Sequence, residues 1–186
     1  MAEPAVHELV RSDPAIEVVW RAFELRPDPV PTLDPKGEYL RRAWANSVYP
    51  LAERVGITMK LPPVQPRSRL AHRAAHWARR QGRFDDYQGA IFRAFFERGE
   101  DIGKIGVLTS LAAEIGLDGE SLRRALESRE FEHSVREDER EAESLGVASV
   151  PAFVADRRGA LSGIQPVERL KRLVEQVRPC PDKPNG

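Results

Sequence analysis

The stretch "SLGVASVPAFVAD", residues 144–156, marks a change from helical to extended structure late in the chain. A charged helix ends at Gly146, a turn of small residues follows, and an apolar run extends from Val150 to Asp156. Proline lacks the N–H that a strand ladder needs, so a sheet tolerates it mainly at edges and strand starts. Two interpretations follow from the residues alone. Either Pro151 is simply the first residue of a strand, or the Val150–Pro151 bond is cis and the turn forms a functional surface.

Extended segments flank a long helical block on both sides. Helical spacing predicts a helix over residues 3–10, and the β-branched and aromatic run 16–23 predicts a strand that is buried on both faces. After the quoted stretch, Asp156-Arg157-Arg158-Gly159 predicts a β-hairpin, with Gly159 at the position that needs a positive φ. A last helix is predicted over 166–177.

The block from about residue 36 to 145 repeats helical periodicity, with about six helices separated by glycine and proline breaks. Its first helix carries a predicted kink at Pro50. Ser68 and Asp118 stand where helix N-caps are expected, and Gly82 stands where a helix is expected to stop.

Composition narrows the classes of partner. Lys and Arg number 29 and Asp and Glu number 29, so no basic field attracts nucleic acid or an anionic membrane. No window approaches 18 apolar residues, and the first residues lack the pattern of a signal peptide. We therefore expect a cytoplasmic protein. The one cysteine, Cys180, lies in a proline-rich tail, so no internal disulfide is expected.

Three motifs follow one another along the chain: "IEVVWRAFELRP" at 16–27, "PRSRLAHR" at 66–73 and "GVASVPAFV" at 146–154. Together they resemble the DsbA-like thioredoxin-fold family that includes FrnE and 2-hydroxychromene-2-carboxylate isomerase-type proteins. The resemblance implies an α/β thioredoxin-like fold, N-terminally incomplete, with an inserted all-helical domain. The domains it implies are a thioredoxin-like domain of residues 1–35 and 146–178, a helical domain of 36–145 and a disordered tail of 179–186.

The same resemblance implies the site. In such proteins the residue matching Pro151 is cis, and the backbone of the residue matching Val150 pairs with a substrate strand. The implied substrate-binding residues are Ser149, Val150, Pro151, Ser68 and His72. Glutathione-dependent relatives further suggest Ser162, Gly163 and Gln165 as groups that present N–H donors to a glutathione carboxylate, against the plainer interpretation of a strand end and helix cap.

Family members begin with a strand that runs into Cys-x-x-Cys, whereas these residues begin inside the following helix. We expect the inner edges of the strands at 17–23 and 151–156 to be unpaired as a result. Three explanations stay open. The true start is upstream, or a short chain fills the gap with reshaped elements or a partner such as a second copy, or the chain is a decaying copy.

The resulting functional hypothesis is a DsbA-like thiol–disulfide oxidoreductase whose cysteine pair lies outside these residues, so that this chain is redox-inactive and has no catalytic residue. Its expected partner is a protein or peptide thiol or disulfide, or a small thiol. The alternatives are a non-redox module that binds a peptide or glutathione-like ligand, and a glutathione-dependent isomerase relative. His72 and His76 have metal-binding spacing, but the absence of a neighbouring glutamate favours a helix-surface or interface pair and no metal.

Overall fold

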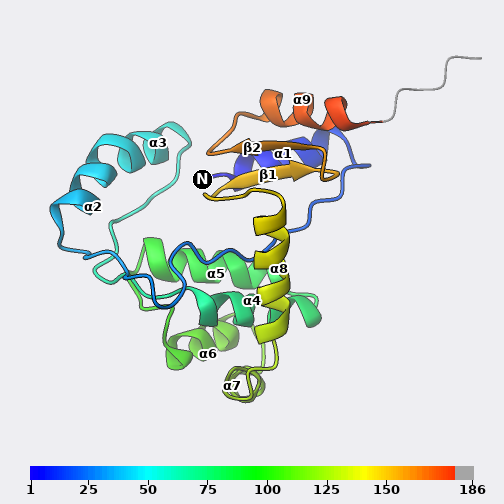
Figure 1. The fold of residues 1–186 in the computed structure, drawn as a ribbon. Helices are drawn as coiled ribbons and strands as arrows, with labels where there is room; N and C mark the ends of the chain where they lie inside the picture. The colour runs from blue at the N-terminus through cyan, green and yellow to red at the C-terminus, as the bar shows by residue number, and fades with distance from the viewer. Residues whose placement is uncertain (179–186) are drawn as a thin grey trace, which may run out of the picture. The chain divides into compact units, whose positions relative to one another are not determined.

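The computed structural model describes residues 1–178, which divide into two compact units (Figure 1). We call Met1–Trp20 together with Ala142 onward the sheet unit, and Arg21–Glu141 the helical unit. Cys180 and the tail 179–186, for which disorder was predicted, lie outside the described residues. The sequence-based domain boundaries at residues 35 and 145 stay predictions.

The sheet unit pairs two strands and packs them against helices. Its complete elements are α1 (Glu3–Ser12), β1 (Ala152–Ala155), β2 (Gly159–Ser162) and α9 (Val167–Val177). The strands are antiparallel, with Ala152 opposite Ser162 and Ala155 opposite Gly159. One face of the hairpin carries Phe153 and Leu161, which pack on a core of Val6, Leu9 and Leu170 from α1 and α9. This arrangement is the hairpin and last helix of a thioredoxin-like fold.

The predicted strand at 16–23 is wrong, because the segment joins no ladder in the described structure. Val18 and Val19 are 37% and 53% exposed, so the segment is not buried on both faces either. A run of β-branched residues becomes a strand only when a neighbour supplies hydrogen bonds, and no described strand lies beside this one. Local propensity was therefore insufficient here.

The predicted hairpin is confirmed, but the role assigned to Gly159 is wrong. Asp156 and Arg157 adopt positive φ angles of 46° and 58°, and the N–H of Arg158 donates to the carbonyl of Ala155. Two consecutive residues with positive φ are typical of a type I′ turn, in which Asp at the first central position is well tolerated. Gly159 instead begins β2 with an ordinary φ.

Gly159 is required by packing. A Cβ placed on it would lie 2.8 Å from Cδ1 of Leu173 and 3.5 Å from Cγ1 of Val177, both on α9. We expect Gly159→Val to lower the free energy of unfolding by roughly 1–3 kcal/mol, as overpacking a filled site does. Urea denaturation measures the change. Ala160→Val, on the next and exposed residue, is the matched control, and an equal effect of both variants would contradict this explanation.

The helical unit is built from consecutive helices. They are α2 (Glu38–Ala43), η1 (Trp44–Val48), α3 (Tyr49–Arg54), α4 (Arg69–Arg80), α5 (Phe84–Phe96), α6 (Ile105–Glu114), α7 (Gly119–Glu127) and α8 (Glu132–Ser144), whose last residues belong to the sheet unit. The core lies among α4 to α7, where Trp77, Tyr87, Leu108 and Leu111 are almost fully buried. Asp118 caps α7 as predicted, accepting hydrogen bonds from the N–H groups of Glu120 and Ser121.

The helix predicted to kink at Pro50 contains a π-helical turn instead of a simple bend. The N–H of Tyr49 donates to the carbonyl of Trp44, the wider spacing of a π turn. Pro50 lies at the start of α3, directly after this turn. A proline cannot donate to the preceding turn and clashes with its carbonyl, so the widened turn accommodates it.

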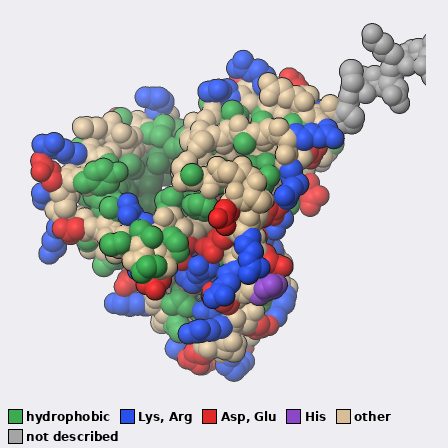
Figure 2. Space-filling model, viewed as in Figure 1, with side chains coloured by type: hydrophobic (Ala, Val, Ile, Leu, Met, Phe, Trp, Pro, Cys, Tyr) green, Lys and Arg blue, Asp and Glu red, His purple; other side chains and the backbone are tan. Residues whose placement is uncertain are grey.

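Hydrophobic side chains gather on the surface over α2 and α3 (Figure 2), where Tyr39 and Tyr49 are 70% and 42% exposed. Trp44 lies beneath them with its ring centroid 5.5 Å from Tyr49 and 6.2 Å from Phe96 of α5. These ring contacts link η1 to α3 and to α5. No helix within residues 1–178 combines the length and the hydropathy that crossing a membrane requires.

Candidate functional site

In the sheet unit, the loop before β1 and the end of β2 form one small polar cluster. The hydroxyl oxygens of Ser149 and Ser162 lie 2.6 Å apart, and the N–H of Gly163 donates to the carbonyl of Pro151 over 2.8 Å. The Val150–Pro151 peptide bond is cis. The structure therefore brings together residues that the sequence placed in two separate groups, one for substrate and one for glutathione.

The backbone of β1 has an inner and an outer edge. In an antiparallel strand, the backbone N–H and C=O groups of successive residues point to alternate sides. The carbonyl of Pro151 accepts a hydrogen bond from Gly163, so it faces β2. The register then places the backbone N–H and C=O groups of Phe153 and Ala155 toward β2 as well. The N–H and C=O groups of Ala152 and Val154 consequently point away from β2. Within the described residues no strand pairs with this side, which we call the outer edge. The Val150 side chain is 45% exposed and that of Val154 is 38% exposed.

The residues suggested for glutathione have their hydrogen-bonding groups largely engaged. The N–H of Gly163 is used by Pro151, and Nε2 of Gln165, a buried residue, donates to the carbonyl of Ser162 over 2.6 Å. Gly163 has a φ of +79°, so it provides the turn between β2 and α9. These contacts shape the loop that supports Pro151, which leaves few N–H donors there for an anion.

Ser68 and His72 belong to the helical unit, where they serve a different arrangement. Ser68 occupies the N-cap position of α4, but its side chain makes no capping hydrogen bond; its carbonyl accepts from the N–H of His72. His72 hydrogen bonds to the backbone of Phe23, while its Nε2 is buried with no partner among the described residues. Burial lowers the pKa of His72 to about 4, so the ring is neutral near pH 7.

The arginines of the "PRSRLAHR" motif bind the segment that directly follows the strand predicted at 16–23. Arg67 donates to the carbonyls of Arg26 and Val30, over 2.7 Å and 3.0 Å. Arg69 pairs with the buried carboxylate of Glu24 at 3.1 Å and with Glu139 of α8 at 2.9 Å. This motif therefore fixes residues 21–30 onto α4.

Asp138 of α8 is the centre of a second part of this network that sequence reasoning missed. Its side chain is 3% exposed and accepts hydrogen bonds from His76 at 2.9 Å, from the N–H of Ala22 at 2.9 Å and from Arg21 at 3.0 Å. Burial raises the pKa of the Asp138 carboxyl, but these hydrogen bonds outweigh burial and hold the pKa below its ordinary value. The i, i+4 spacing of His72 and His76 was a usable signal, although it pointed toward metal chemistry.

The chemistry of this network is structural. Within residues 1–178, no group of three His, Cys, Asp or Glu side chains is arranged to hold a metal ion. Arg21 also pairs with Glu141 at 3.3 Å, so the first and last residues of the helical unit are linked. These charged side chains pair with one another and hydrogen bond to the backbone of residues 21–24. These contacts hold the segment in place without strand pairing.

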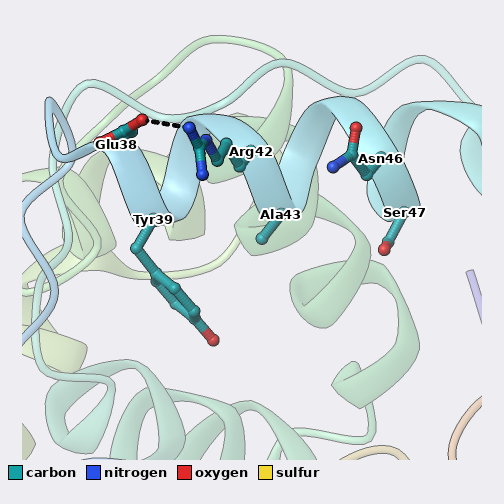
Figure 3. A pocket seen from close by; sticks show the side chains of 6 residues that line it. All are labelled: Glu38, Tyr39, Arg42, Ala43, Asn46 and Ser47. Carbon is teal, nitrogen blue, oxygen red and sulfur yellow. Dashed lines mark ion pairs between the residues drawn. The ribbon is translucent and has the colours of Figure 1, made fainter.

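One shallow cavity of about 460 Å³ lies on the helical unit along α2 and η1 (Figure 3). Its lining comes from one continuous helical segment: Glu38, Tyr39, Arg42, Ala43, Asn46 and Ser47. Glu38 and Arg42 pair with each other at 2.6 Å, and the Tyr39 ring points away from the helix. Since its charged groups neutralise one another and no second element converges on it, we assign this cavity no chemistry.

Comparisons with known proteins agree with this fold. Residues 1–175 match the family model of the DSBA-like thioredoxin domain. The Bacillus subtilis protein YwbO, described as uncharacterized, is 38% identical over 143 residues, which are 75% of this chain and 72% of that protein.

Two solved structures are similar. A probable DsbA oxidoreductase from Streptomyces coelicolor, SCO1869, superposes with a TM-score of 0.80 at 26% identity, over 98% of this chain and 86% of that one. A putative protein disulfide isomerase from Nitrosomonas europaea gives a TM-score of 0.68 at 16% identity, over 93% and 87% of the chains, and so shows the fold alone. With its fold, its loop before β1 and its match over residues 1–175, the chain belongs to the family of DSBA-like thioredoxin domains.

Proposed function

We propose that this chain holds an extended polypeptide at Ser149, Val150 and Pro151, as the substrate-binding part of a DsbA-type thiol–disulfide oxidoreductase. The observation that carries the proposal is the outer edge of β1, where the N–H and C=O groups of Ala152 and Val154 have no partner among the described residues; the Val150 side chain, in the loop just before it, is 45% exposed. Such an edge binds an extended peptide by adding a strand, with backbone hydrogen bonds for affinity and side-chain contacts for specificity.

Family membership supports a thiol-bearing protein as the partner. The Streptomyces coelicolor neighbour is described as a probable DsbA oxidoreductase. In such chemistry a thiolate attacks a disulfide and a second thiol resolves the mixed disulfide. These 186 residues contain one cysteine, so they supply no pair for the resolving step. We therefore assign this chain the binding role and no redox step of its own.

An extended peptide fits the site better than a small thiol does. The outer edge offers a row of backbone groups spaced as in a strand, whereas the N–H of Gly163 and the amide of Gln165 are already engaged. Glutathione binding at Ser162, Gly163 and Gln165 therefore stays the second candidate. A non-redox peptide-binding module would use the same edge. It differs from the proposed oxidoreductase function only in that the bound peptide is not passed to a cysteine pair.

Titration with an uncharged extended peptide and with reduced glutathione tests this proposal, with amide shifts of Val150 and Ala152 as the readout. We expect the peptide, and not glutathione, to move these signals. Val150→Asp should weaken peptide binding about tenfold, roughly 1.4 kcal/mol, because it puts a charge into an apolar contact. Ala160→Asp, an exposed position on β2, should leave binding unchanged.

The opposite pattern would contradict the proposal. If glutathione moved the signals of Ser162 and Gly163 while the peptide moved none, the small-thiol function would replace it. Dithiol exchange catalysed by the protein carrying Cys180→Ser would show that the assignment of a binding role alone is wrong.

A further inference from the structure

Residues 21–24, which we call the strap, are bound through their backbone to α4 and α8. The N–H of Ala22 donates to Asp138 of α8 over 2.9 Å. The ring of His72 on α4 hydrogen bonds to the backbone of Phe23. Both contacts lie within the helical unit, so they hold the strap without help from the sheet unit.

The ring of His72 lies where only its neutral form is well accommodated. Its Nε2 is buried and has no hydrogen-bond partner among the described residues. A proton taken up at Nε2 would therefore be a buried, charged donor without an acceptor, which is costly. The same proton costs nothing once water reaches the ring. Acid should consequently favour an arrangement that exposes His72.

The charged groups around His72 do not compensate for a proton on its ring. Arg69 and His76 on the same helix disfavour a positive charge there, whereas Asp138 of α8 favours one. Both oxygens of Asp138 are already engaged, Oδ1 by Arg21 and Oδ2 by His76. Further carboxylates of the strap and of α8 pair with Arg69; they are Glu24, Glu132 and Glu139.

The strap is the part of this region that moves at the lowest cost. The side chain of Arg21 is 53% exposed. By contrast, α4 packs through Ala74 and Trp77, which are 0% and 1% exposed, into the core of the helical unit. Local opening follows the route that disrupts the least buried apolar surface. Exposure of His72 by release of the strap is therefore cheaper than displacement of α4.

We propose that the strap is a pH-sensitive device, which detaches from α4 and α8 in acid while the core of the helical unit stays folded. Uptake of a proton by His72 drives the release, and loss of that proton reverses it. The strap begins at Arg21, the first residue of the helical unit, so its release lengthens the chain that connects this unit to the sheet unit. The inference goes beyond the proposed function, since it requires no ligand at β1.

Hydrogen exchange of the full chain in its native state, measured from pH 6.5 to pH 4, tests the release. Burial lowers the pKa of His72 from 6.5 to about 4, so the protection factor of the Ala22 amide should fall about tenfold per pH unit, roughly 300-fold in total. Leu111, which is 0% exposed in the core, should stay better protected than Ala22 at every pH. Urea well below the unfolding transition should speed exchange at Leu111 and leave Ala22 unaffected, as a local opening requires.

Two variants assign the proton. His72→Asn keeps a side-chain donor for Phe23 but does not titrate, so the protection of Ala22 should no longer depend on pH in this range. His76→Gln is the matched control, because it keeps a donor for Asp138 and leaves His72 in place; it should retain the wild-type dependence.

Each outcome decides for or against the device. A pH dependence at Ala22 that is lost in His72→Asn and kept in His76→Gln supports it. A flat profile at Ala22 in the wild-type protein overturns it, whether or not the variants fold. A dependence that persists in His72→Asn or disappears in His76→Gln overturns it as well. Loss of protection at Ala22 and Leu111 together would show that the whole unit unfolds, which also contradicts a local release.

Discussion

Replacing Asp138 with alanine is expected to lower the free energy of unfolding of the helical unit by roughly 3–5 kcal/mol, the usual cost of breaking a buried ion pair. The carboxylate is 3% exposed and is the acceptor for the ring of His76, the N–H of Ala22 and the guanidinium of Arg21. Truncation leaves two buried donors, His76 and Ala22, without a partner. Urea denaturation followed by circular dichroism measures the loss.

The neighbouring residue on α8 provides the control. Glu137 is 60% exposed and, among residues 1–178, pairs only with His133, so Glu137→Ala should change stability by no more than about 0.5 kcal/mol. Hydrogen exchange at Ala22 adds a local readout, because its amide should become unprotected in Asp138→Ala alone. If the amide of Ala22 stayed protected, the account of how residues 21–24 are held would be wrong.

The helical unit should lose stability as the pH falls from about 6.5 toward 4. Burial lowers the pKa of His72 from 6.5 to about 4, so the unfolded chain takes up a proton in this range more readily than the folded chain. The stability contributed by the neutral ring is present above 6.5 and is lost as the pH approaches 4. A difference of this size corresponds to about 3 kcal/mol.

Unfolding measured at intervals across this range tests the pH dependence. His72→Leu removes the titrating ring and should flatten the profile between pH 6.5 and 4, whatever its effect on stability at pH 7. His133→Gln, at a position where the ring is 73% exposed, should leave the profile unchanged. The carboxyl of Asp138, with a pKa below its ordinary value of 3.8, contributes a loss only at lower pH. A flat wild-type profile would show that His72 is not buried as described.

Sequence reasoning succeeded where local rules suffice. Helices that show helical periodicity and are followed by a glycine, such as the one before Gly82, begin and end close to the predicted residues. The hairpin after Pro151 follows from turn-forming residues between two apolar runs. The family motifs gave the fold class, because their order along the chain is specific even where each motif alone is weak.

It failed where structure depends on partners distant in the sequence. The run at 16–23 has strand propensity, but residues 21–24 are held by side chains of α4 and α8 in place of a ladder. Gly159 looked like a turn glycine because the space required by Leu173 cannot be read from neighbouring residues. Asp138 lies 62 residues from His76, so spacing could not reveal their contact.

The predicted site residues fall into the same two groups, those placed by local sequence and those placed by distant contacts. Ser149, Pro151, Ser162 and Gly163 lie together because a short hairpin joins them. Ser68 and His72 lie in the helical unit, where the motif that contains them binds the connecting segment. A motif shared across a family reports equally well on packing and on ligand binding, and only the contacts tell the two apart.

Backbone amide exchange along β1 tests the open edge most directly. In dilute protein, the amides of Phe153 and Ala155 should be protected by β2, whereas those of Ala152 and Val154 should exchange freely. Adding the uncharged peptide should then protect Ala152. Equal protection of all four amides in dilute, peptide-free protein would contradict the account, since it would mean that the outer edge already has a partner within the chain.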